Sequence, residues 1–237
     1  MVKKEDIFKE TTLNIFTDAS VRKYYNDETV GCAGAIAVKG DNIIDESYRT
    51  IRFSTNNNSE IDAIRLGVLL ALKYRNKNIK HINLFSDSKI SIYGLKEWIF
   101  KWINNINNEI MYSSSKLPVK NQEIFLNIIH TIINNRLEIN LFHQRGHINI
   151  NSQSDLTKAI IDFKKNNYYN PNIYFDIEFI RAISYYNNYV DNNTRNLLSC
   201  SNPQDYNSMD TFYTRPILYS CYGLDINLYK KLINAKY

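Results

Sequence analysis

Four carboxylates stand where widely separated segments of the sequence could bring them to one point. They are Asp18, Glu60, Asp87 and Asp155, and each lies close to the expected start or end of a strand or helix. Clustered anions cost free energy unless a cation lies between them. A divalent metal is the simplest such cation, and a metal held by acids alone indicates phosphodiester chemistry.

The elements that would position these acids follow from the hydrophobic pattern. Residues 12–18 are predicted to form a strand that ends at Asp18, followed by a polar loop. Residues 33–38 and 43–53 are predicted to form two more strands of an antiparallel meander, with a Gly-Asp-Asn turn between them.

The next two acids fall at the ends of the following elements. Residues 58–75 carry apolar residues at helical spacing, which places Glu60 in the first turn of a helix. Residues 81–86 are predicted to form a short buried strand, and Asp87 comes directly after it. Glu60 can therefore lean over the sheet edge at which Asp87 lies.

The last acid, Asp155, also falls near the start of a predicted helix. Residues 121–135 are predicted to form an amphipathic helix and residues 138–143 a final strand. After His147, a helix that begins at about Ser152 would hold Asp155 in its first turn.

This order of elements predicts an α/β fold with a mixed five-stranded sheet. An antiparallel meander would be followed by parallel strands reached through crossover helices, with helices flanking the sheet. We expect a lead at residues 1–11, a catalytic domain at 12–165 and a C-terminal extension at 166–237. The extension is rich in Tyr and Asn, since it contains 12 of the 18 tyrosines.

Composition narrows the class of protein. The chain has 237 residues, of which 44% are hydrophobic, so a real core is expected, and its net charge of +5 is only a hint of polyanion binding. Three distant cysteines (Cys32, Cys200 and Cys221) indicate neither a zinc site nor a disulfide framework. Without a visible signal peptide or an apolar run long enough for a bilayer, we expect no membrane association. The expected location is the cytoplasm, or the host cytoplasm for a viral or phage protein.

Six ordered segments between residues 12 and 165 resemble the motifs of type 1 ribonuclease H. Residues 16–20 (Phe-Thr-Asp-Ala-Ser) resemble its first-strand motif, in which Gly usually follows the Asp. Residues 55–60 match its Thr-Asn-Asn/Gln-x-x-Glu, and residues 86–88 match its Thr/Ser-Asp-Ser. Three later segments resemble the helix, handle and following helix of the bacterial branch and its final Gly-His…Asp element: Gly94-Leu95 with Trp98-Ile99 and Trp102, residues 118–121, and Gly146-His147 with Asp155.

The resemblance implies an endoribonuclease that hydrolyses the RNA strand of RNA–DNA hybrids, leaving 5′-phosphate and 3′-hydroxyl ends. It implies two Mg²⁺ ions, for which Mn²⁺ could substitute, held by Asp18, Glu60, Asp87 and Asp155. His147 would shuttle a proton. The implied substrate contacts are Thr55, Asn56, Asn57 and Ser88.

The handle departs from the family pattern. In the bacterial branch this protrusion is usually basic, whereas residues 103–117 contain Lys116 as their only Lys or Arg. We therefore expect the affinity for a hybrid to depend on another surface of this chain.

Two other functions remain compatible with the sequence. The same fold could serve a DNA or junction nuclease, or a non-catalytic module that binds nucleic acid. The extension could pack on the nuclease, mediate self-association, bind a protein partner, or bind a single strand through stacked tyrosines.

Overall fold

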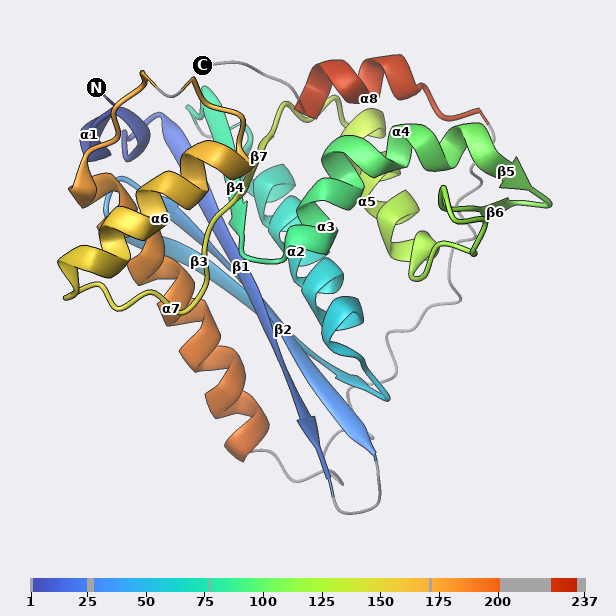
Figure 1. Ribbon diagram of the computed structural model, residues 1–237, viewed down its shortest axis with the longest axis horizontal. Helices are drawn as coiled ribbons and strands as arrows, with labels where there is room; N and C mark the ends of the chain where they lie inside the picture. Colours follow the sequence, from blue (N-terminus) through green and yellow to red (C-terminus); the bar gives the residue numbers. More distant parts are fainter. Residues whose placement is uncertain (1, 25–27, 77, 171, 201–222, 234–237) are drawn as a thin grey trace.

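A five-stranded mixed sheet lies between two layers of helices (Figure 1). The computed structural model describes residues 2–24, 28–76, 78–170, 172–200 and 223–233. The strand order is β3-β2-β1-β4-β7. Strands β1 to β3 pair antiparallel, whereas β4 and β7 extend the sheet in parallel, so the predicted fold is confirmed. The strands are β1 (Thr12–Lys23), β2 (Thr29–Lys39), β3 (Asn42–Arg52), β4 (His81–Ser86) and β7 (Asn140–His143).

The first hairpin is longer than the sequence analysis predicted. Strand β1 continues past Asp18 to Lys23, where it pairs with Thr29 of β2. The prediction took residues 19–32 for a loop because they contain many polar and small residues. Cross-strand pairing satisfies the backbone groups of this segment and makes an arm beyond the acids, the β1–β2 arm, along which β3 also pairs as far as Arg52.

Side chains of β1 alternate between the two helical layers. Leu13 and Ile15 face one hydrophobic cluster, whereas Phe16 faces the other, as the two-residue period of a strand requires. The first layer contains α2 (Asn56–Tyr74), α5 (Gln122–Asn134), α8 (Ile226–Ile233) and the short helices α3 (Lys89–Tyr93) and α4 (Ile99–Trp102), joined by a π-helical turn at Gly94–Trp98. The second contains α1 (Lys4–Ile7), α6 (Gln153–Asn166) and α7 (Ile177–Cys200). A 3-10 turn at Ile103–Asn105 and a two-stranded β5–β6 ribbon (Ile106–Asn107 and Ile110–Met111) form the handle.

The described parts of the predicted extension pack onto both layers. Helix α7 lies along β1 and β2 (orange in Figure 1), and the ring of Tyr186 stacks on Phe16 with centroids 5.1 Å apart. In the other layer, the fully buried Tyr229 of α8 donates a hydrogen bond to the carbonyl of Leu95, at 3.1 Å. The boundary predicted at residue 166 therefore does not separate the described residues into two packing units.

The described residues do not test whether the extension mediates self-association or binds a protein partner. Residues 201–222 and 234–237 lie outside the described part of the chain. Self-association and a protein partner stay predictions. Among the described helices, none is both long and apolar enough to cross a membrane.

A ladder of asparagines crosses the middle of the parallel part of the sheet. Asn83 of β4 donates to Asn14 of β1 at 2.9 Å, and Asn140 of β7 donates to Asn83 at 3.1 Å. Asn14 in turn donates to the carbonyl of Ile7. The three amides are buried and each satisfies its neighbour, so the ladder fixes the register of these strands.

We expect Asn83→Ala to lower the free energy of unfolding by about 2–3 kcal/mol, because it leaves buried polar atoms of Asn14 and Asn140 unpaired. Urea denaturation followed by circular dichroism would measure this loss. Asn104→Ala, at an exposed position of the handle, is the matched control and should change stability by less than about 0.5 kcal/mol. Equal losses in the two variants would contradict a stabilising role for the ladder.

Candidate active site

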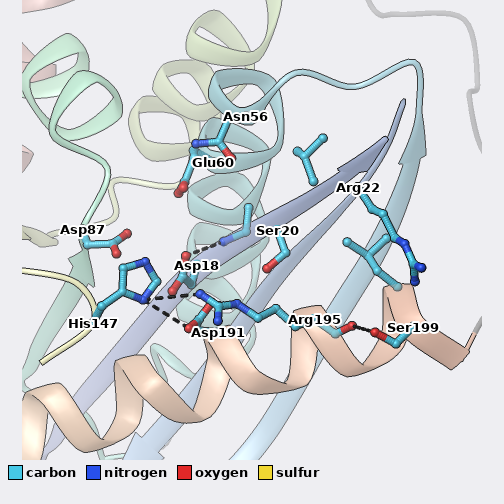
Figure 2. Close-up of a pocket in the computed structure, with 13 residues that line it drawn as sticks. Asp18, Ser20, Arg22, Asn56, Glu60, Asp87, His147, Asp191, Arg195 and Ser199 are labelled. Carbon is cyan, nitrogen blue, oxygen red and sulfur yellow. Dashed lines mark hydrogen bonds and ion pairs between the residues drawn. The ribbon is translucent and has the colours of Figure 1, made fainter. Parts of the chain in front are cut away.

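Three of the four predicted acids meet at the sheet. Asp18 comes from β1 and Asp87 from the residue after β4. Glu60 comes from α2, which begins at Asn56 and not at the predicted residue 58, so Glu60 lies just past the first turn. One carboxylate oxygen from each lies within 4.8 Å of the others. They line one pocket of about 600 Å³, which also contains Asn56 and His147 (Figure 2).

Local hydrogen bonds hold each acid in place. The backbone N–H of Ala19 donates to Asp18 Oδ1 at 2.7 Å. Thr55 caps α2 by accepting from the backbone N–H of Asn58, which orients the turn that carries Glu60.

The loop after β7 closes against Asp87. A Cβ atom on Gly146 would lie 2.0 Å from Asp87 Oδ2, so only glycine lets this backbone approach so closely. Next to it, His147 has a φ of 53°, a left-handed conformation that turns its side chain into the pocket. The predicted Gly146-His147 element therefore lies beside the acids.

The surroundings of the three clustered acids disfavour their charged forms. Burial, followed by the charges of Asp87 and Asp191, raises the pKa of Asp18 to about 8. Burial and the neighbouring acids also raise the pKa of Glu60 well above its usual range, and burial is the largest cause of the raised pKa of Asp87. These shifts are those expected of anions that share a confined space.

The donor set fits a divalent cation. Glu60 Oε2 and Asp87 Oδ1 are buried and have no hydrogen-bond partner among the described residues. Such atoms cost free energy unless an unseen group satisfies them. Carboxylate oxygens are ligands that hard divalent ions prefer, so Asp18, Glu60 and Asp87 could hold one.

Helix α7 contributes three further polar residues that the sequence analysis did not single out. Asn187 donates to Asp18 Oδ2 at 3.3 Å and accepts from Gln144 Nε2 at 2.6 Å. Asp191 lines the pocket and lies 3.4 Å from His147 Nδ1 through its Oδ2. Arg195 Nε contacts the other oxygen of Asp191 at 2.8 Å.

Asp155 does not join this group. It lies in the first turn of α6, where its backbone N–H donates to Ser152, and it is not among the residues that line the pocket. The sequence predicted that Asp155 would complete the acid group from the first turn of this helix. Helix α6 instead packs over β4 and β7 through Phe163, whereas α7 crosses β1 next to Asp18.

The signal that could have found the missed residues is their spacing. Asn187, Asp191 and Arg195 are four residues apart, so they lie on one face of a helix. The Tyr- and Asn-rich composition of this segment hid that periodicity from the sequence analysis.

Two of the four predicted substrate residues line hollows, whereas Thr55 and Ser88 line neither of these two hollows. Asn56 lines the acid pocket beside Glu60. Asn57 lines a neighbouring groove of about 230 Å³ together with Trp98 and Trp102. Ser88 caps α3, and its hydroxyl also donates to Ser91 Oγ at 2.8 Å.

A mixed sheet that gathers carboxylates beside an open pocket could hold metal ions of the kind that phosphodiester hydrolases use. The sequence model of the RNase H family matches residues 10–159. The chain therefore belongs to the ribonuclease H family of enzymes, as its motifs predicted. The match ends before α7, which carries Asp191.

Known proteins resemble part of this chain. A ribonuclease H of Clostridium botulinum (strain Hall) is 30% identical over 111 residues, which cover 47% of this chain and 68% of that protein. The solution structure of the PFV RNase H domain is 18% identical, covers 66% of this chain and 94% of that one, and has a TM-score of 0.47. The structure of a foamy viral protease-reverse transcriptase in complex with an RNA/DNA hybrid is 18% identical. The match covers 67% of this chain and 20% of that one, and its TM-score is 0.46.

We expect the stability of the metal-free protein to fall as the pH rises from 3.8 to about 8. The sign follows from linkage: the folded state keeps the proton of Asp18 at pH values where the unfolded chain has lost it. Asp18→Asn should reduce this slope and unfold at a higher temperature than the wild type at pH 8. Thermal melts with a chelator at pH 5 and pH 8 would measure both effects, with Asp155→Asn as the control outside the cluster. A lower melting temperature for Asp18→Asn at pH 8 would show that the acids are not mutually destabilising.

Proposed function

We propose that this chain hydrolyses the RNA strand of RNA–DNA hybrids at the cluster of Asp18, Glu60 and Asp87. The observation that carries the proposal is the meeting of these three acids in a chain of the ribonuclease H family. The name of the Clostridium botulinum relative agrees with it. The expected products have 5′-phosphate and 3′-hydroxyl ends.

The cofactor in this proposal is a pair of Mg²⁺ ions, for which Mn²⁺ could substitute. The all-oxygen donor set and the raised pKa of Asp18 support hard cations at this place. Such ions, when bound, would activate a water and stabilise the leaving 3′ oxygen. The carboxylates of the protein hold them, and the sheet and α2 keep those carboxylates in position.

We assign the fourth carboxylate to Asp191 in place of Asp155. Asp191 lines the same pocket, is 8% exposed, and contributes to the raised pKa of all three clustered acids. Asn187, one turn earlier, donates to Asp18 and thereby ties α7 to the cluster. Asp155 has no comparable contact with the pocket.

His147 is proposed to move a proton between the pocket and solvent. Its side chain is 66% exposed, and its Nδ1 faces Asp191 at 3.4 Å. An exposed imidazole can both donate and accept a proton, which suits it to this role.

Asn56 and Asn57 are the proposed contacts to the substrate. Each lies at the mouth of a hollow, Asn56 beside Glu60 and Asn57 beside the two tryptophans. Their amides both donate and accept, which suits base edges and the 2′-hydroxyl that marks an RNA strand. Thr55 and Ser88 remain proposed as support for these contacts, because both hydroxyls serve as helix caps.

One substrate panel tests the activity. A single labelled sequence would be offered as RNA–DNA hybrid, double-stranded RNA, double-stranded DNA and single strands, with Mg²⁺ or with chelator. We expect metal-dependent cutting of the RNA in the hybrid alone, and its loss in Asp87→Asn. Cutting of DNA would move the chain to the DNA or junction nucleases, and no cutting of any substrate would favour a binding module.

A pair of variants tests the fourth acid. We expect Asp191→Asn to lower kcat by roughly 100-fold or more, because it removes a proposed ligand, whereas Asp155→Asn should stay within about twofold of the wild type. Steady-state cleavage of the hybrid at fixed Mg²⁺ would measure both. The reverse order would return the role to Asp155.

A further inference from the structure

The pocket continues beyond the acids as a groove between the β1–β2 arm and the end of α7. Figure 2 shows the carboxylates and His147 at one end, and Arg22 with Ser199 at the other. Arg195 lies between them. The remaining lining residues of this far end are Ser20, Val21 and Leu198, so among the described residues it contains no acid.

The two arginines come from distant parts of the chain and are brought together by specific contacts. Ser20 and Thr194 share a hydrogen bond of 2.9 Å between their hydroxyls. Tyr24 donates from its hydroxyl to the carbonyl of Leu198 at 3.3 Å. Leu198 is buried against the arm, so the end of α7 is fixed on it.

Arg22 is held by an aromatic side chain of the same strand end. Its guanidinium lies 5.5 Å from the centre of the Tyr24 ring, a cation–π contact that limits its freedom. Within the described residues it forms no ion pair. Arg195 is paired with Asp191, but its side chain is 56% exposed to the groove.

We propose, on the basis of the proposed function, that Arg22 and Arg195 bind phosphates of the strand that is cleaved, a few nucleotides from the cut. Guanidinium groups match phosphate oxygens with paired hydrogen bonds. Arg22 stands four residues beyond Asp18 on β1, or about 13 Å at the rise of a strand. A nucleic acid strand advances about 3.4 Å per phosphate along its axis, so the groove spans several phosphates.

The site of Arg22 and Arg195 supplies the positive charge that the handle lacks. Residues 103–117 provide one Lys, whereas a polyanion that approaches the acids needs cationic contacts elsewhere. A cationic end on the same groove also orients the strand, because its backbone is attracted at one end and must reach the acids at the other.

Binding of a hybrid to the Asp87→Asn protein, measured by fluorescence anisotropy at several salt concentrations, tests the proposal without cleavage. We expect Arg22→Gln in this background to weaken binding roughly 3- to 10-fold, and to reduce the slope of log K against log salt by about one. Arg22→Lys should restore part of the affinity because it keeps the charge. Arg136→Gln is the matched control, since it removes an exposed arginine near the start of β4, and it should leave the slope unchanged.

A hybrid with single neutral methylphosphonates along the RNA strand locates the contact. One or two positions should weaken binding of the parent protein but not of Arg22→Gln. A wild-type slope and affinity in both Arg22→Gln and Arg195→Gln would overturn the inference. Cleavage of the hybrid by the wild type is read separately, so a failure of the proposed function remains distinguishable from a failure of this site.

Discussion

Repulsion among three buried carboxylates is the constraint on which the rest of the structure depends. Asp18, Glu60 and Asp87 would separate if their backbones could move, since burial already disfavours their charges. Their positions are fixed by elements that are stable for other reasons: two adjacent parallel strands and a helix packed against them. The free energy of the core thus maintains an arrangement that is unfavourable without a cation.

Helix α7 connects that core with the site. On its buried side, Tyr186 and Val190 pack in the same cluster as Phe16, immediately below Asp18 on β1. Asn187 follows Tyr186 and Asp191 follows Val190, and both polar side chains lie beside the acids. Because a helix turns about 100° per residue, the hydrophobic contacts of α7 set how near its polar groups lie to the three clustered acids. A shift of α7 along the sheet would displace its hydrophobic contacts and its polar groups together.

Acidic and basic side chains lie toward opposite ends of the pocket. Carboxylates gather where three strands and α2 meet, whereas the arm and the last turns of α7 supply Arg22 and Arg195. A phosphodiester strand carries one negative charge per nucleotide, so the proposed substrate would be attracted to the cationic end and would be repelled from the acidic end unless cations neutralised it. The length of the β1–β2 arm makes this separation possible, because a hairpin that turned directly after Asp18 would leave no surface for Arg22.

The sequence by itself determined the acids whose positions depend on local structure. Asp18 lies on a recognisable strand, Asp87 follows another, and Glu60 lies near the start of a helix, so local periodicity was enough to predict them and the sheet between them. Only the tertiary structure decided that Asp191, not Asp155, lines the pocket. Both acids lie on helices after the last strand, and the choice depends on which helix crosses β1. That is set by long-range packing of aromatic side chains such as Tyr186 and Phe163, which local spacing does not encode.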